Sequence, residues 1–474
     1  MIRKLGYRKA APMKRLPSWR TPPVTTWILC LIPVGIATGT TLLMNPYFGN
    51  MDDGGMLALA ASNGPITFTN ELKGSLGTGF IRASSILLIW PTYWLGTVAG
   101  PVWFYLANTV LVFACLAAFG LAMGRLFGWK SAWLGVVFLS ASLLWPYTAE
   151  LFFYPSLSEK GIILGAALMF WWVAEAPRLT SPIAYWISLA AVSLFAFATK
   201  TQILVFVPGF LYALWAYRST ARGHISALRA IVVTGYLILL SAVLLILALG
   251  GSYTKGTQGS LDLSFLGDRR FQFLVALTVL YVLALVLRVF MRRNQWSDWV
   301  PAVMLLSMCG TFVIWDIRNY FLAIAGVMVG SAAATVAGWL RPVWMQATLA
   351  VTIVILASAW LLFRLPAVYG SLASVGDFLA SPIVKQLDAE RATVYVSCME
   401  APVHYNKYAA DIGLNDVNFA YLGDRPSDTD LGQGVGAEYV FGDSRLCPWA
   451  PDSSNWQTVW TNGNPQSFQL FARY

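Results

Sequence analysis

Two adjacent aspartates, Asp52 and Asp53, stand a few residues beyond the first long apolar segment of the chain. They lead through Gly54-Gly55 into an apolar-rich run, Met56 to Ala61, which is suited to lie along a bilayer surface. Ionised acids at a membrane face are expensive and usually functional. A carboxylate there can accept the proton of a hydroxyl group that attacks a second molecule. The alternative is a solvated turn, because Asp and Gly are common turn residues.

Further polar residues stand at the outer ends of separate apolar segments, where a helix bundle could bring them around one cavity. Lys and Arg would hold a phosphate, and Arg can bind it with two hydrogen bonds. Acids and bases mixed at a membrane boundary suit a ligand that is part lipid and part anion. For any one basic residue alone, a side chain that reaches from a helix end to water is the better explanation. These residues are Glu71, Lys73, Arg82, Glu150, Tyr154, Glu159, Lys160, Lys200, Lys255, Arg269, Arg270, Asp316 and Arg318.

Composition determines the class of protein that must position these residues. Hydrophobic residues make up 57% of the chain and charged residues 11%. Many separate apolar runs are long enough to span a bilayer, which takes about 20 helical residues. The chain is therefore predicted to be a polytopic α-helical membrane protein. Its basic segment 1–23 is too long and too charged for a signal peptide, and no small-residue cleavage site follows the first span.

The distribution of charge orients the chain in the membrane. Seventeen Lys and Arg residues fall in the tail and in alternate loops, where only Glu175 and Asp298 oppose them. The positive-inside rule places these segments in the cytoplasm and favours contact with anionic lipid head groups. Asp52 and Asp53 then face the opposite side. Because the net charge of +10 is distributed in this way, nucleic acid is not an expected partner.

Three regions follow from this pattern. Residues 1–23 form a basic cytoplasmic tail, residues 24–363 a transmembrane domain whose first outer loop covers 45–100, and residues 364–474 an extracytoplasmic domain. Within the outer loop, the segment from Ile86 to Val98 is expected to lie at the surface, since proline and interfacial aromatic residues interrupt it. The eleven predicted spans are residues 24–44, 101–124, 131–147, 161–175, 183–199, 203–217, 228–249, 271–290, 299–315, 319–338 and 343–363.

The segment from 364 to 474 has the composition of a soluble domain, with 12 acids against 7 bases. A helical stretch, Ala401–Ile412, lies between the first two of five alternating β-branched and aromatic runs. We therefore expect a small α/β domain outside the cytoplasm. The predicted strands are Thr393–Ser397, Val417–Tyr421, Glu438–Phe441, Gln457–Trp460 and Phe468–Phe471.

The five cysteines divide between these regions. Cys30, Cys115 and Cys309 fall in predicted spans, where Cys acts as a small apolar residue. Cys398 and Cys447 both fall in the outer domain, where an oxidising compartment would let them form a disulfide. Two free thiols are the alternative.

Common catalytic motifs are missing from the sequence. It contains no HExxH, no Walker loop, no GxSxG and no paired CxxC zinc motif. Metalloprotease, ATPase and serine hydrolase activities are therefore unsupported.

Four stretches, taken in order, resemble the GT-C glycosyltransferases that use lipid-phosphate sugars. The branch most similar contains the protein O-mannosyltransferases and the lipid A aminoarabinose transferase. Departures are a Glu in place of that branch's Arg-Pro-Asp type sequence, the absence of its His-Pro pair, and fewer spans than the lipid A enzyme. The stretches are Asp52-Asp53-Gly54-Gly55-Met56-Leu57-Ala58-Leu59-Ala60, Leu143-Leu144-Trp145-Pro146-Tyr147 onward to Glu159, Phe197-Ala198-Thr199-Lys200-Thr201 continuing to Val207-Pro208, and Arg318-Asn319-Tyr320-Phe321.

The resemblance implies a GT-C-like fold in a membrane, expected to be the bacterial inner membrane, and inverting transfer from a polyprenyl-phosphate sugar donor. Asp52 would be the base, with Asp53 as second choice, and Glu159 would position the acceptor or the donor sugar. The acceptor would be a cell-envelope glycan, a lipid or a protein. No cofactor is expected if Lys and Arg stabilise the leaving phosphate, although a divalent metal is not excluded. Candidate substrate and phosphate ligands are Lys200, Arg269, Arg270, Arg318, Tyr154 and Glu150.

Two other classes of function remain open. A secondary transporter would also have many spans, but transporters tend to contain internal repeats and interrupted helices near the midplane. No repeat is visible here, and the ionisable residues gather at the outer boundary. A polymerase or flippase of lipid-linked glycans would share the membrane setting, but it does not explain the Asp52-Asp53 loop or the outer domain.

Overall fold

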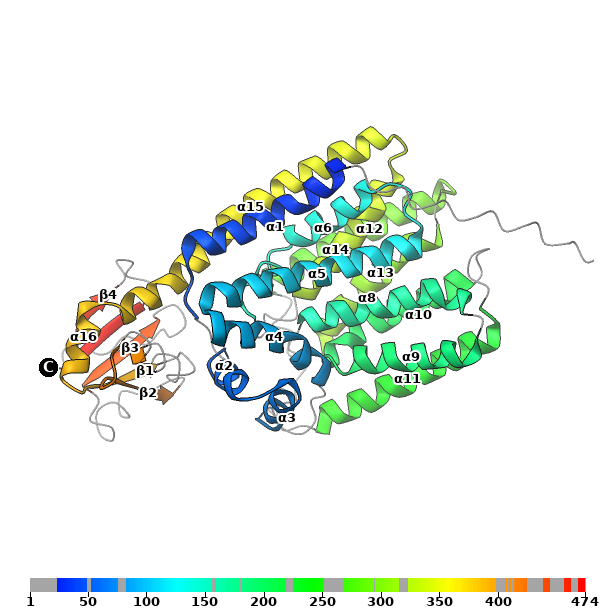
Figure 1. Ribbon diagram of the computed structural model, residues 1–474. Coiled ribbons are helices and arrows are strands. Elements are labelled where there is room, and N and C mark those ends of the chain that lie inside the picture. The colour runs from blue at the N-terminus through cyan, green and yellow to red at the C-terminus, as the bar shows by residue number, and fades with distance from the viewer. Residues whose placement is uncertain are drawn as a thin grey trace, which may run out of the picture.

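The fold is a long helical bundle joined to a small sheet (Figure 1). This computed structural model describes residues 24–48, 53–75, 82–155, 159–179, 181–218, 225–250, 267–293, 295–314, 323–397, 406, 409–410, 413–423, 438–443, 456–461 and 468–473. The chain is thus an α-helical membrane protein with a small C-terminal sheet, as the composition predicts.

A helix lies at each of the eleven predicted spans. Among the described residues, α1, α5, α11, α12 and α15 are long and apolar enough to cross a bilayer. Others are shorter, and α6 has only twelve residues. A helix of that length rises about 18 Å, whereas the hydrocarbon core of a bilayer is about 30 Å thick. The count of eleven crossings therefore stays a prediction. The helices are α1 (Val24–Met44), α5 (Pro101–Phe127), α6 (Trp133–Leu144), α8 (Glu159–Glu175), α9 (Pro182–Phe197), α10 (Val207–Arg218), α11 (Ala227–Gly250), α12 (Arg269–Phe290), α13 (Trp299–Ile314), α14 (Ala325–Trp339) and α15 (Val343–Leu379).

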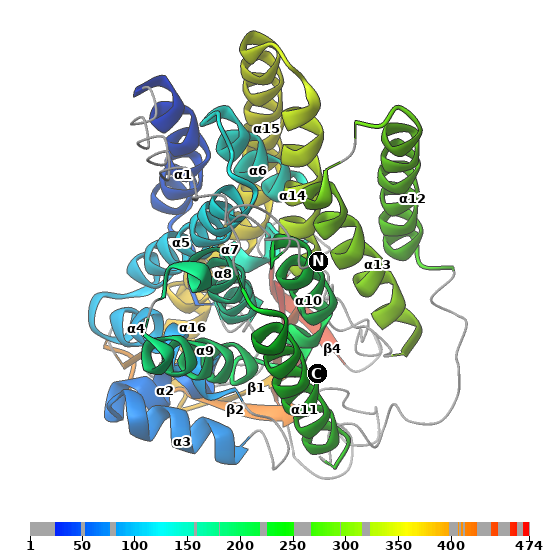
Figure 2. The same ribbon diagram turned by 90° about the vertical axis from the view of Figure 1, so that its right-hand side faces the viewer.

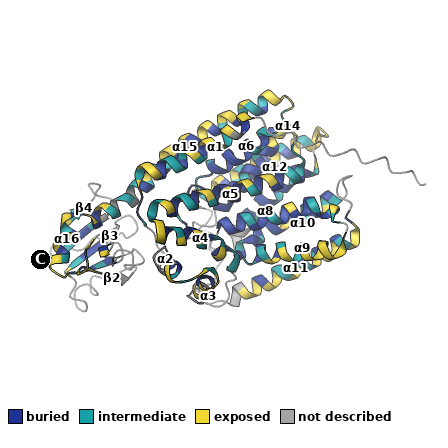
Figure 3. Cartoon of the chain, in the orientation of Figure 1, coloured by how far each residue is buried: buried dark blue, intermediate teal, exposed yellow. Residues whose placement is uncertain are grey.

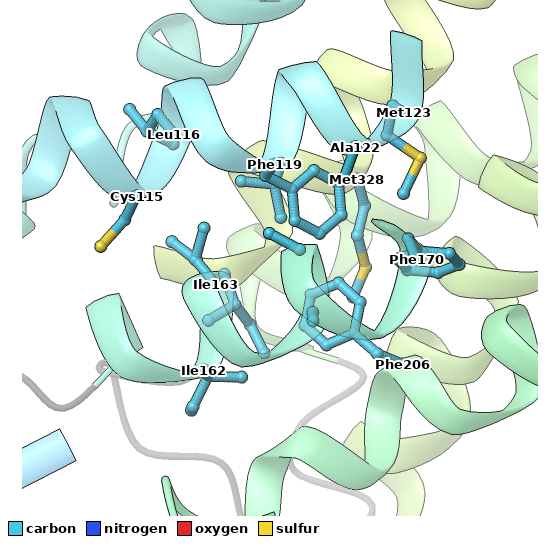
Figure 4. Packing of buried hydrophobic residues seen from close by; sticks show 14 of the residues in the cluster. Cys115, Leu116, Phe119, Ala122, Met123, Ile162, Ile163, Phe170, Phe206 and Met328 are labelled. Carbon is cyan, nitrogen blue, oxygen red and sulfur yellow. The ribbon is translucent and has the colours of Figure 1, made fainter. Parts of the chain in front are cut away.

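Helices α5 and α8 lie next to each other within the bundle (Figure 2), and aromatic and aliphatic side chains fill the space around them (Figure 4). The Phe119 ring of α5 stacks on Phe138 of α6 at 5.8 Å between centroids. Close approach of α14 to α6 requires glycine: a Cβ added at Gly330 would lie 2.1 Å from the Ser142 hydroxyl. Outer helices such as α1, α11 and α12 keep exposed apolar faces (Figure 3), as expected for surfaces that contact lipid tails.

Three helices form the described part of the first outer loop: α2 (Asp53–Ser62), α3 (Pro65–Ser75) and α4 (Ala83–Ala99). They lie toward the end of the bundle nearest the sheet (Figure 1). The predicted surface segment is α4, which continues as a helix through Pro91. Leu57 of α2 and Phe104 of α5 both pack against Gly96, where a Cβ would be 3.0 Å from each.

The longest helix joins the bundle to the sheet. α15 has 37 residues and runs through position 364, where the soluble composition begins, to end at Leu379. Its last turn enters the core of the sheet domain, where the Phe378 ring stacks on Phe441 at 3.9 Å and 6°. Tyr47, just after α1, joins the same apolar cluster. The bundle and the sheet therefore share one continuous helix.

The C-terminal domain contains the five predicted strands in the order β2-β1-β3-β5-β4. β1 pairs in parallel with β2 and β3, whereas β5 pairs antiparallel with β3 and β4. Of the predicted helix Ala401–Ile412, only positions 406, 409 and 410 are described. The elements are α16 (Pro382–Ala389), β1 (Thr393–Ser397), β2 (Asn418–Gly423), β3 (Tyr439–Asp443), β4 (Trp456–Thr461) and β5 (Phe468–Arg473).

Candidate functional site

A buried ion pair joins two of the predicted site residues. Glu159, the first residue of α8, is 0% exposed, and its Oε1 atom lies 2.6 Å from Nζ of Lys200. Lys200 directly precedes the 3-10 helix η2 (Thr201–Phe206). The second carboxylate oxygen of Glu159 accepts no hydrogen bond from any residue that the structure describes. A buried acceptor without a partner would be satisfied by a hydrogen bond from a water molecule or from a ligand.

The first outer loop is attached to the turn that carries Lys200. At the start of α4, the Ser84 amide donates to the Ala198 carbonyl (3.0 Å) and the Ser85 hydroxyl to the Thr199 carbonyl (2.9 Å). Gly161 permits this contact, because a Cβ there would lie 2.2 Å from the Ser85 oxygen. The start of α4, in the first outer loop, is thus held beside the turn that carries Lys200.

A second acid, Glu150, begins the short helix α7 (Glu150–Phe153). It is half-buried, and burial raises the pKa of its carboxyl group to about 7. Arg364 and Arg270 oppose this rise, while the charge of Glu159 adds to it. Glu150 therefore titrates near neutral pH, within electrostatic range of Glu159.

Arg270 is the second residue of α12, two positions after Asp268, which caps this helix. The Asp268 carboxylate caps the helix by accepting from the Arg270 amide (2.8 Å) and also pairs with the Arg270 guanidinium. This pairing holds the pKa of Asp268 below its usual value. The guanidinium carbon lies 5.8 Å from the Tyr147 ring centroid, whereas Arg269 is exposed. Arg270 is thus oriented by protein contacts, and Arg269 faces outward.

Four of the predicted residues, Glu150, Glu159, Lys200 and Arg270, therefore belong to one set of charged groups. Tyr154 follows α7; its carbonyl accepts from Lys160 (3.4 Å), and its ring contacts Phe153 at 4.9 Å. Asp53 starts α2, and its side chain is not described. Six further predicted residues lie outside the described residues: Asp52, Lys255, Asp316, Arg318, Cys398 and Cys447.

The sequence analysis did not identify three residues that interact with the predicted polar residues. Asp268 pairs with Arg270, Asn108 accepts from Lys160, and Arg364 acts on Glu150. Asp268 carries a recognisable signal, an acid immediately before the first residue of an apolar helix. Asn108 carries another, since a lone amide inside a predicted span is costly unless it is paired. Arg364 carries no signal in the sequence, because its nearness to Glu150 depends on how α15 packs.

The described side chains form no candidate metal site. No group of three or more His, Cys, Asp or Glu residues in this part of the chain could hold an ion. Metal-independent chemistry remains a prediction.

Comparisons with known proteins identify a fold. No family model matches the sequence, and no curated protein matches it. Among solved structures, the chain is similar to ArnT from Cupriavidus metallidurans in the apo state, with 13% identity and a TM-score of 0.51 over 95% of this chain and 98% of that one. A second structure of ArnT from Cupriavidus metallidurans, bound to undecaprenyl phosphate, has 12% identity and a TM-score of 0.47 over 95% and 97%. The likeness to the apo structure confirms the GT-C-like fold that the sequence resemblance implies.

Proposed function

We propose that this chain is a membrane glycosyltransferase that moves a sugar from a polyprenyl-phosphate donor to an acceptor outside the cytoplasm. The proposal is supported by the fold shared with ArnT over nearly the whole of both chains. ArnT binds undecaprenyl phosphate. A donor of that class also suits the mixture of basic side chains and apolar helices in this chain.

The observation that carries the proposal is the buried carboxylate of Glu159. One of its oxygens pairs with Lys200, and the other has no partner among the described residues. Burying a carboxylate is costly unless its oxygens are paired. A ligand that donates a hydroxyl or amine hydrogen would satisfy the second oxygen, and sugars present several hydroxyl groups.

The chemistry would be an inverting displacement. An acceptor hydroxyl gives its proton to Asp52 while its oxygen attacks the anomeric carbon of the donor sugar. The bond between that carbon and the phosphate oxygen breaks, and polyprenyl phosphate leaves with the electron pair. Asp53 is the second choice for the base, since α2 begins there. Glu159 would position the reacting sugar.

Basic residues would stabilise the charge that develops on the leaving phosphate. Lys200, Arg269, Arg270 and Arg318 are the candidates for this role. Lys200 has the strongest case among the described residues, because it is largely buried beside Glu159, with 11% of its side chain exposed. Glu150 and Tyr154 would contribute to the same substrate region, and no metal is required by this scheme.

The proposed orientation puts the amino terminus in the cytoplasm of a bacterium and the C-terminal domain outside the inner membrane. Reporters that are active only outside the cytoplasm test this arrangement. A fusion after Tyr474 should be active, and a fusion near Arg222 should be silent. An active reporter at Arg222 would contradict the orientation.

Substitution of the aspartates tests the mechanism. Asp52→Asn should abolish transfer of a radiolabelled sugar in membranes, because general base catalysis contributes about 10²–10⁴-fold. Asp53→Asn should have a smaller effect, and the two effects should exchange if Asp53 is the base. Asp377→Asn, an exposed acid near the end of α15, is the matched control. Wild-type transfer by both stable aspartate variants would overturn the mechanism.

A further inference from the structure

Two buried polar residues from different helices meet beside the candidate site. Asn108 lies in the middle of α5, Lys160 is the second residue of α8, and both are 0% exposed. Lys160 Nζ donates to Asn108 Oδ1 at 2.6 Å. Neither residue has a role in the chemistry proposed above.

This pair binds a run of backbone carbonyl groups. Asn108 Nδ2 donates to the carbonyls of Leu151 (2.8 Å) and Phe152 (2.7 Å). Lys160 Nζ donates to the carbonyls of Pro155 (2.7 Å) and Tyr154 (3.4 Å). Four of the five carbonyls from 151 to 155 are therefore bound by two side chains.

The segment needs such partners because its own secondary structure is short. α7 has four residues, and the last carbonyls of a helix have no partner within it. In the interior of a membrane bundle, unsatisfied backbone groups are costly. The Tyr369 hydroxyl of α15 adds a further hydrogen bond to the Phe152 carbonyl at 3.3 Å. The path of α7 and of the two residues after it is thus determined by side chains from α5, α8 and α15.

The contacts of Asn108 and Lys160 affect the two acids of the candidate site, Glu150 and Glu159. The bound segment starts directly after Glu150, and Lys160 directly follows Glu159. Successive residues of a helix point about 100° apart. With Lys160 fixed to α5, the neighbouring Glu159 is directed to Lys200 at 2.6 Å.

We propose that Asn108 and Lys160 are positioning residues, a carbonyl clamp that holds Glu150 and Glu159 in the geometry required for sugar transfer. The role rests on the proposed function, because it assumes that these acids bind a reacting sugar. The clamp itself makes no contact with the substrate. Its removal should therefore lower the rate of transfer rather than the affinity for the donor.

The test compares four variants with the wild type. Lys160→Met keeps the length of the side chain without its donors, and Asn108→Leu removes the amide. Asn108→Asp is the milder variant if these do not fold, since it keeps the acceptor for Lys160 and loses only the two donors. The control is Tyr281→Phe in α12. It also removes a buried hydrogen bond, which runs from the tyrosine hydroxyl to the Asp298 carbonyl (2.8 Å).

Amide hydrogen exchange measures whether the clamp stabilises this segment, and it does not depend on transfer activity. The amides of Leu151, Phe152 and Tyr154 donate within the segment, to the carbonyls of residues 148, 149 and 150. They should exchange about tenfold faster in the clamp variants, which corresponds to about 1.4 kcal/mol of lost local stability. Unchanged exchange in folded variants would refute the clamp.

Steady-state transfer then reports the positioning role. We expect kcat to fall about 10- to 100-fold in the clamp variants, since small misplacements of reacting groups cost this much, with the donor KM little changed. Tyr281→Phe should keep the wild-type kcat. Faster exchange with a wild-type kcat would show a structural role only and overturn the proposal. If the wild type itself transfers no sugar, the proposed function fails, and the positioning role fails with it, while exchange still decides whether the clamp exists.

Discussion

Removal of Lys200 should destabilise the protein more than removal of the whole ion pair. Lys200→Met leaves the Glu159 carboxylate 0% exposed and without its cationic partner. Breaking a buried pair in this way costs about 3–5 kcal/mol, because one charge remains buried and unpaired. Glu159→Gln should cost less, since the Lys200 side chain retains some exposure and can reach toward water.

The double variant Glu159→Gln/Lys200→Met separates structure from function. Neither buried charge remains, so its free energy of unfolding should be within about 1–2 kcal/mol of the wild-type value. The sum of the two single-variant costs should exceed the cost of the double variant by a coupling energy of about 2–3 kcal/mol, as expected for residues in direct contact. Transfer activity should nevertheless remain lost, because the carboxylate that binds the sugar is absent.

Reversible unfolding in mixed micelles measures these free energies, and a transfer assay on the same preparations measures activity. A double-variant cost equal to the sum of the two single-variant costs would show that the two side chains are not coupled. Recovery of transfer in the double variant would show that Glu159 has no role in the reaction. Either result would refute the reasoning.

Three other predictions concern Glu150, Gly161 and the two cysteines of the C-terminal domain. The raised pKa of Glu150, about 7 in the folded state against an ordinary value near 4.5, favours folding below about pH 4.5, and this contribution is lost as the pH rises through 7. Relative to wild type, Glu150→Gln should therefore gain roughly 1–2 kcal/mol of stability between pH 5 and pH 8, after allowance for partial exposure, and a pH-independent difference would refute the assignment. Gly161→Ala should destabilise the protein by about 1–3 kcal/mol, because the new methyl group collides with Ser85, and a neutral effect in a melting curve would contradict the close packing there. Mass mapping of non-reduced protein should find a peptide that links Cys398 to Cys447, and free thiols at both positions would remove that assignment.

Much of the fold could be predicted because membrane helices and sheet strands leave strong periodic signals. Apolar length and alternating basic loops located a helix at every predicted span, with most ends within a few residues. The main difference lies at the junction of the two domains. Composition changes at Arg364, but α15 continues to Leu379, since a helix can leave the apolar layer without a break. The helical form of 65–75, α3, is also not evident in the sequence, because its composition is mixed and its apolar periodicity weak.

The sequence indicated which types of residue form the site, but it revealed only some of the contacts between them. Glu159 and Lys200 stand out because charged residues at the ends of apolar segments are rare. Their direct pairing depends on the packing of α8 against α9, which no local pattern reveals. The same holds for Asn108 and Lys160, whose partners are backbone carbonyls and therefore leave no trace in the sequence.

Turnover of a labelled donor by the purified protein tests the central claim most directly. Wild-type protein in nanodiscs, given a polyprenyl-phosphate sugar and an acceptor fraction from the cell envelope, should release free polyprenyl phosphate and move the label to the acceptor. Glu159→Gln, folded as judged by its melting curve, should release little or none. If the wild type leaves the donor intact, or instead carries it unchanged across the bilayer, this chain is not a glycosyltransferase.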